Sequence, residues 1–274
     1  MRHSRSRSWY AVVAVVVFII GTNVHDLLRY VGLRRFFQSW IVNGLANTLQ
    51  IILSVFGLSV AHRIGFTRTF RELGLRVPIG RALAFALISS LPMLLAFALT
   101  SNINPRMSVL SVGVGCVIAP FAEEVLFRGY MFRQLYRHAR WGFWLAALVP
   151  SVLFALVHMY QAEGVGELVG ILAVTGLGSL LGCWVFMRWQ DNLWAVFALH
   201  SLMNLWWEVF AVDDTALGGW LANLARLVTV LMAIVLTIYK DRIWKPLAIE
   251  AQNVIDTNEN VESISTERIS LSFA

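Results

Sequence analysis

The chain has 274 residues, of which 58% are hydrophobic and only 14% charged, and its mean hydropathy is +0.68. A soluble domain carries about 25% charged residues, so this composition excludes an ordinary soluble protein. It predicts an all-α, polytopic integral membrane protein. The net charge of +6 does not indicate nucleic-acid binding, because most arginines cluster between apolar segments, as membrane topology requires. Cys116 and Cys183 fall in apolar segments and predict packing residues rather than a disulfide framework.

Apolar segments long enough to cross a membrane recur along the chain. A transmembrane helix needs about 20 mostly apolar residues, and the sequence predicts about eight of them. Their expected bounds are 9–24, 39–61, 79–100, 107–132, 141–160, 165–187, 192–212 and 217–239. The first is interpreted as an uncleaved anchor, since no Ala-x-Ala site follows it. We expect N-terminal helices with an interfacial loop in 1–106, a core with the C-terminal helix in 107–240, and a disordered cytoplasmic tail in 241–274.

Basic residues lie mainly on one side of these expected helices. If the N-terminus is inside, the inner segments hold most of the arginines and both lysines that flank the helices. The few outer arginines are Arg29, Arg34, Arg35 and Arg106. Because basic loops stay in the cytoplasm, we expect both termini to be cytoplasmic. The first outer loop, 27–37, combines basic and aromatic residues and predicts a short interfacial helix.

Ionisable residues inside an apolar span are the strongest functional signal. Glu123, Glu124 and Arg128 lie in the expected helix 107–132, where each charge costs at least about 2.5–3.5 kcal/mol. Residues four apart share a helix face, so Glu124 and Arg128 should form an ion pair while Glu123 points elsewhere. Glu123 is then free to face a cavity as a general base. The alternative is a structural charge cluster that ties helices together.

Two histidine motifs occur in later spans. In Phe154-x-x-x-His158 the phenylalanine can restrain the ring, and in His200-x-x-x-Asn204 two donors share a face. Such donors can stabilise an oxyanion, orient water or bind a metal. The alternatives are a packing histidine and an interhelical hydrogen bond. Glu123 and His158 both lie roughly 26 Å from the turn between their helices, at about 1.5 Å per residue, so the motifs can converge.

Other residues carry weaker expectations. Glu208 shares the face of His200 but lies near the outer end, which favours an interfacial role. Glu167 and Arg226 both lie toward the outer side and could form a structural pair. A tryptophan-rich cavity lining would suit a lipid-like or helical peptide, and the expected lining residues are Trp194, Trp206 and Trp207.

Several intramembrane protease chemistries lack their parts in this sequence. There is no His-Glu-x-x-His zinc motif, and no aspartate lies inside an expected span. Ser179 follows Gly178, but leucines come next rather than the glycine of a rhomboid-like serine motif. Close helix packing is therefore the better interpretation of Ser179.

The three motifs, in this order in a multi-span protein, resemble the CPBP family. That family includes the type II CAAX prenyl endopeptidases and the bacteriocin-processing and bacteriocin-immunity proteins. The resemblance covers about 107–210 and implies an intramembrane endopeptidase. By the family pattern Glu123 would activate water and His158 would position it, while His200 and Asn204 would stabilise the oxyanion. The residues that would support this site are Glu124, Arg128 and Phe154.

The resemblance leaves the cofactor and the substrate open. The family is commonly called metalloprotease, and Glu123, His158 and His200 make a possible zinc set, but a metal-free glutamate mechanism is also compatible. The expected partners are the lipid bilayer and a membrane-embedded or lipidated protein or peptide, not nucleic acid. One alternative is a non-catalytic binding, immunity or scaffold protein of the same family. Another is a transporter with a buried proton relay, although the sequence shows no internal repeat.

Overall fold

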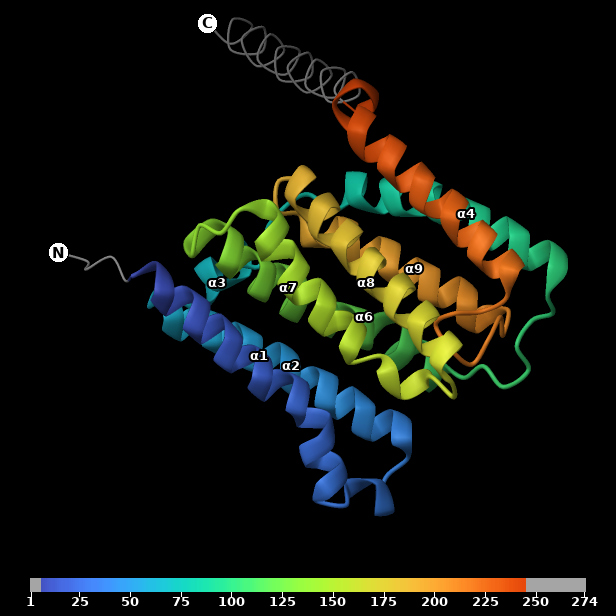
Figure 1. The fold of residues 1–274 in the computed structure, drawn as a ribbon, viewed down its shortest axis with the longest axis horizontal. Helices are drawn as coiled ribbons and strands as arrows, with labels where there is room; N and C mark the ends of the chain where they lie inside the picture. Colours follow the sequence, from blue (N-terminus) through green and yellow to red (C-terminus); the bar gives the residue numbers. More distant parts are fainter. Residues whose placement is uncertain (1–5, 245–274) are drawn as a thin grey trace, which may run out of the picture. The chain divides into compact units, whose positions relative to one another are not determined.

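The computed structural model describes residues 6–244, which are mainly helical and contain no strand (Figure 1). Seven helices in this part of the chain are long and apolar enough to cross a membrane: Arg7–Tyr30, Ser39–His62, Gly80–Thr100, Val109–His138, Phe143–Gln161, Val165–Arg188 and Trp220–Trp244. The prediction of an all-α, multi-pass membrane protein is thus confirmed. Residues up to Ala233 belong to one compact unit, and a second begins at Ile234. Most of the expected tail, 245–274, lies outside the described residues.

The expected span 192–212 corresponds to helix α9, Leu193–Val209, which has 17 residues. At about 1.5 Å per residue it is roughly 26 Å long, at the lower limit for crossing the hydrocarbon. It begins where the Asn192 side chain accepts a hydrogen bond from the Trp194 backbone, at 3.0 Å. It packs against α4, Gly80–Thr100, and α8, Val165–Arg188. This short helix carries the last of the three motifs.

Helices α1, Arg7–Tyr30, and α2, Ser39–His62, lie side by side (Figure 1). The apolar stripe of α1 continues to Leu28, which packs with residues at the start of α2, so the helix runs past the expected end. The prediction of an interfacial helix over 27–37 is therefore wrong. Its first part belongs to α1, and only Leu33–Arg35 forms a separate 3₁₀ turn.

The span Val109–His138 is a broken helix. After α5, Val109–Val112, the chain forms a π-helical segment at Gly113–Ile118, then α6 at Ala119–Glu124, then a second π-helical segment at Val125–Phe132. Pro120 has no N–H to donate, which explains a wider turn before it. Such π segments recur at functional sites. Here they flank the two glutamates on both sides.

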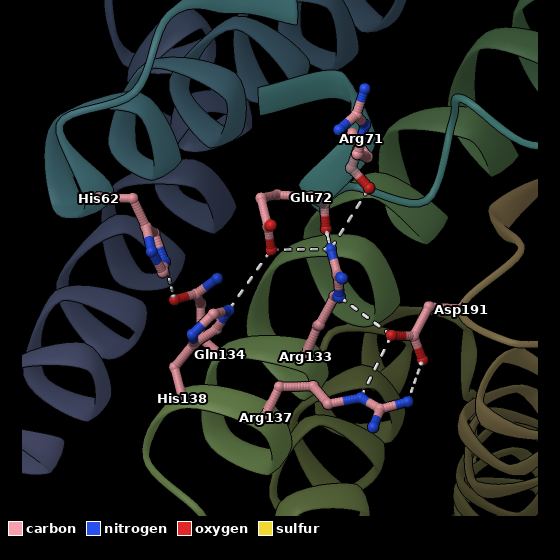
Figure 2. A network of polar contacts seen from close by, with 8 residues as sticks. All are labelled: His62, Arg71, Glu72, Arg133, Gln134, Arg137, His138 and Asp191. Carbon is pink, nitrogen blue, oxygen red and sulfur yellow. Dashed lines mark hydrogen bonds and ion pairs between the residues drawn. The ribbon is translucent and has the colours of Figure 1, made fainter. Parts of the chain in front are cut away.

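The arginine-rich loops gather at one end of the bundle, which we call the inner end. There Arg133 forms ion pairs with Glu72 of α3, Phe66–Glu72, at 3.0 Å, and with Asp191 at 3.1 Å (Figure 2). Arg137 donates to both oxygens of Asp191, each at 3.2 Å. His138 Nε2 lies 3.5 Å from a Glu72 oxygen. This network joins three segments that are far apart in the sequence.

A backbone seam continues this network. Gly74 adopts a φ of +77°, and a Cβ there would lie 2.0 Å from the carbonyl oxygen of Asp191. Leu193 N donates to Gly74 O and Trp194 Nε1 donates to Leu75 O, both at 3.0 Å. Only glycine fits such a close backbone approach. The opposite end, which we call the outer end, carries the loops around 101–108, 157–164 and 210–219.

The inner network should respond to pH through Glu72. The His138 ring and the Arg133 guanidinium lower the pKa of Glu72 from 4.5 to about 2, against the opposing effect of burial. Because folding depresses this pKa, the carboxylate stabilises the fold above about pH 4.5, and that stabilisation is lost as the pH falls toward 2. The gap in thermal midpoint between the parent and Glu72→Gln should therefore shrink over that interval. A gap that stays constant would contradict the assignment.

Candidate active site

The residues of the three motifs line one cavity of about 720 Å³. They come from α6 and the π segment after it, from the end of α7, Phe143–Leu156, and from α9. The motif residues in the lining are Glu123, Glu124, Arg128, Phe154, His158, His200 and Asn204. Segments about 80 residues apart in the sequence thus meet, as the comparison of depths predicted.

Glu124 and Arg128 form the ion pair expected from their spacing. Arg128 Nη1 lies 3.0 Å from Glu124 Oε1, and each residue is only 2% exposed. The guanidinium carbon lies 4.9 Å from the centre of the Phe154 ring. A Cβ on Gly182 of α8 would lie 2.9 Å from Arg128 Nη2, so a glycine is what makes room for the guanidinium. Arg128 is therefore held by charge, by an aromatic face and by a close helix.

His200 connects the two glutamates. Its Nδ1 lies 2.8 Å from Glu124 Oε1, and its Nε2 lies 3.8 Å from Glu123 Oε2. An ionised carboxylate can only accept a hydrogen bond, so Nδ1 carries a proton and Nε2 faces Glu123. The Glu123 side chain is 27% exposed, whereas that of Glu124 is almost fully covered. Spacing within one helix predicted this difference between the glutamates, but it could not predict the contact with His200.

His158 lies in the turn that follows α7, rather than inside the helix. Its Nδ1 is 2.7 Å from the carbonyl oxygen of Phe154, and the two rings are 4.6 Å apart. A carbonyl oxygen only accepts, so Nδ1 is the protonated nitrogen and Nε2 of the neutral ring is an acceptor. Phe154, which was expected to restrain the His158 ring, therefore holds it through its backbone carbonyl as well as through its own ring.

Side chains of α9 hold the π-helical segment Gly113–Ile118. Asn204 Nδ2 donates to Gly115 O at 3.3 Å, and the Ser201 hydroxyl donates to Cys116 O. The amide of Asn204 has a second N–H that no described acceptor takes. These bonds fix α9 against the helix that carries the glutamates, and they set the position of Asn204 in the cavity wall.

The candidate zinc ligands are not gathered into a three-ligand site in the described part of the chain. Within residues 6–244, no three histidine, cysteine, aspartate or glutamate side chains come together as metal ligands. Nδ1 of His200 is bonded to Glu124 and Nδ1 of His158 to the Phe154 carbonyl, so only Nε2 of each ring is left toward the cavity. Structural zinc sites need four ligands and catalytic sites three plus water. The zinc set of Glu123, His158 and His200 therefore stays a prediction from the sequence.

The cavity extends from the glutamates toward the outer end. Its lining includes residues of the outer loops, among them Tyr160, Asp213 and Thr215, and none of the residues that form the inner network. Glu208 also lines it and accepts a hydrogen bond from the Ser111 hydroxyl at 2.9 Å.

Two expectations about this region are wrong. Of the three tryptophans expected in the lining, only Trp207 is there; Trp206 packs in an apolar cluster with α4, and Trp194 lies toward the inner end. Glu167 and Arg226 form no ion pair in the described part of the chain. Glu167 instead accepts from the Glu163 backbone at 2.9 Å. Both expectations failed for the same reason, because the sequence does not show which way each side chain points around the helix bundle.

Comparison with known proteins agrees with this geometry. Residues 104–206 match the family model of Rce1-like type II CAAX prenyl endopeptidases. The resemblance carried by the three motifs is confirmed. The matched segment contains every motif residue of the cavity, and the match supports a membrane protease role.

A second similarity covers a comparable fraction of the chain. The Bacillus subtilis (strain 168) protein named "Putative membrane peptidase YdiL" is 28% identical over 95 residues. The match covers 35% of this chain and 34% of that relative, so the chain spans about a third of the relative's length. No solved structure shows a significant match.

Proposed function

We propose that this protein is an intramembrane endopeptidase that hydrolyses a peptide bond of a membrane-embedded or lipidated substrate through water activated by Glu123. The observation that carries the proposal is the convergence of Glu123, His158, His200 and Asn204 on one cavity among membrane-spanning helices. Glu123 is the carboxylate of the pair that faces the cavity without an arginine partner. The family match supports the same reaction class.

The geometry suggests a role for each side chain. Glu123 accepts a proton from water, and Nε2 of His158 accepts a hydrogen bond that orients it. The hydroxide attacks the scissile carbonyl carbon, and the developing oxyanion receives hydrogen bonds from Asn204 and from Nε2 of a doubly protonated His200. Glu123 then gives its proton to the leaving amine as the carbon–nitrogen bond breaks. Glu124 orients His200 from behind.

Cleavage by the purified protein tests this proposal and the metal question together. The detergent-solubilised protein is mixed with a library of apolar peptides, with and without a prenylated cysteine, and the products are identified by mass spectrometry. We expect cleavage that chelator treatment leaves intact. Loss of turnover on chelation and recovery with stoichiometric zinc would overturn the metal-free mechanism, and the absence of cleavage of all peptides would count against the peptidase.

The direction of the cavity gives a topology prediction. With both termini cytoplasmic, the cavity opens to the non-cytoplasmic side. A cysteine at Gly219 should react with a membrane-impermeant maleimide in intact cells, whereas one at Gly65 should react only after permeabilisation. A Cβ at either glycine meets no neighbour within 4 Å, and the native cysteines are buried, so the two variants are matched. The reverse pattern would invert the orientation.

A further inference from the structure

One cation in the cavity wall has no anionic partner within residues 6–244. The cavity is lined by two arginines, and Arg128 is paired with Glu124. Arg226, on the helix Trp220–Trp244, has no carboxylate within 4 Å among the described residues. Its guanidinium carbon lies 4.6 Å from the centre of the Trp207 ring, which covers one face. A partly buried cation without a counter-charge in a membrane protein is a functional signal.

The contacts of Arg226 fix the direction of its remaining donors. Nη1 donates to Asn223 Oδ1 at 2.9 Å and to Leu217 O at 3.4 Å, and Nη2 donates to Ala216 O at 2.9 Å. Nε donates to none of the described acceptors. Nε and Nη2 are the edge of the guanidinium that binds a carboxylate through two parallel hydrogen bonds. On this edge Nε–H has no acceptor among the described residues, and Nη2 uses one of its two N–H groups, for Ala216 O.

Other polar groups of this region are unsatisfied or already used. Thr229, one turn further along the same helix, is 0% exposed and lines the cavity, yet its hydroxyl bonds to none of the residues that the structure describes. The carboxylates of the same wall have partners of their own: Glu208 accepts from Ser111, and Asp213 accepts from Thr215. Asp214 also lines the cavity, but it lies outside ion-pairing distance of Arg226. A buried polar group without a partner is costly, and a bound ligand removes the cost.

We propose that Arg226 binds a carboxylate of the peptide substrate and so positions the chain relative to Glu123. This inference rests on the proposed function and adds a specificity residue to it. The carboxylate belongs either to the C-terminus of the peptide or to an acidic side chain near it, and both would present the same two oxygens to the guanidinium. Arg226 lies outside the matched segment 104–206.

Peptide binding to the Glu123→Gln variant tests the proposal without depending on cleavage. The probes are three fluorescent peptides of one apolar sequence: a free C-terminal acid, a C-terminal amide, and the amide with one glutamate near its end. We expect the acid, the glutamate peptide or both to bind at least about tenfold more tightly than the plain amide, the scale of one charge-assisted hydrogen-bond pair. The two acidic probes distinguish the terminal from the side-chain carboxylate.

Variants at Arg226 complete the test. Adding Arg226→Gln should reduce the difference between acidic and amide probes to less than about twofold, with little change for the amide, and Arg226→Lys should retain part of the preference. Arg106→Gln removes an exposed charge at the same outer end and should keep the full preference. Equal binding of all three probes to the parent would overturn the assignment, and so would a preference that survives Arg226→Gln. Arg226 would then have only a structural role, through its hydrogen bonds to Ala216 O and Leu217 O. If the protein binds the acidic probes more tightly but cleaves no peptide, the carboxylate site at Arg226 is supported and the proposed peptidase activity is contradicted.

Discussion

Glu123→Gln should abolish cleavage while leaving the fold intact. The amide keeps the shape of the side chain but cannot accept the proton of water, so turnover should fall by about a hundredfold to ten-thousandfold, the usual contribution of a general base. The Glu123 side chain is 27% exposed, and among the described residues its one contact within ion-pairing distance is His200 Nε2 at 3.8 Å. Thermal stability should therefore change little. Turnover and the thermal midpoint are measured on the same preparation.

Asp214→Asn is the matched control for this variant. It removes another carboxylate that lines the same cavity, at the outer loop rather than at the reacting centre. It should leave turnover close to that of the parent. If Glu123→Gln retained near-normal turnover, or if both substitutions lowered it equally, the assignment of Glu123 as the base would be wrong.

Glu124→Gln should mainly destabilise the protein. It leaves Arg128 in a site that is 2% exposed without its counter-charge, and breaking a buried ion pair typically costs about 3–5 kcal/mol. Glu124→Gln also changes the acceptor of His200 Nδ1 at 2.8 Å, so turnover should fall partly for that reason. Arg128→Met alone should be destabilising by a similar amount, since it leaves the carboxylate unpaired. Denaturation in mild detergent measures the stability of both single variants.

The double variant Glu124→Gln with Arg128→Met separates charge pairing from packing. Neither charge is then orphaned, so the double variant should be more stable than the sum of the two single losses predicts. Its turnover should stay as low as that of Glu124→Gln, because His200 still lacks its carboxylate. Additive losses without coupling would show that the two residues act independently, and the glutamates would need to be treated as a jointly titrating pair.

Sequence could predict the spans and the content of the cavity, because both depend on local patterns. Hydropathy located the helices, and four-residue spacing predicted the pair of Glu124 with Arg128. Depth along the helices placed His158 and Glu123 at one level. The predictions that failed depended on the rotation of each helix about its own axis and on the residue at which each helix ends. Helix α1 continues to Tyr30 because its apolar stripe continues. Trp194 lies outside the cavity because its side chain points toward the inner end, where it donates to Leu75 O.

The inner network was missed altogether, although a signal was present. Glu72 and Asp191 are acidic residues in segments otherwise rich in arginine, and a carboxylate among several arginines indicates an ion pair. Their partners could not be named from sequence, because Asp191 reaches arginines 54 and 58 positions earlier in the chain. The hydrogen bond between Glu124 and His200 could not be predicted for the same reason, since the two residues are 76 positions apart in the sequence.

The seam between Gly74–Leu75 and the loop before α9 also constrains the order in which the protein assembles. Trp194 and Leu75 are 119 positions apart, so the inner end cannot close until α8 has been synthesised and inserted. Closing such a long loop costs entropy before any contact repays it, which makes this closure a late event in biogenesis. A nascent chain that stops before the seam should be a target for membrane quality control. Two fragments divided in the outer loop around 101–108 should reassemble when co-expressed, because each would carry one side of the seam.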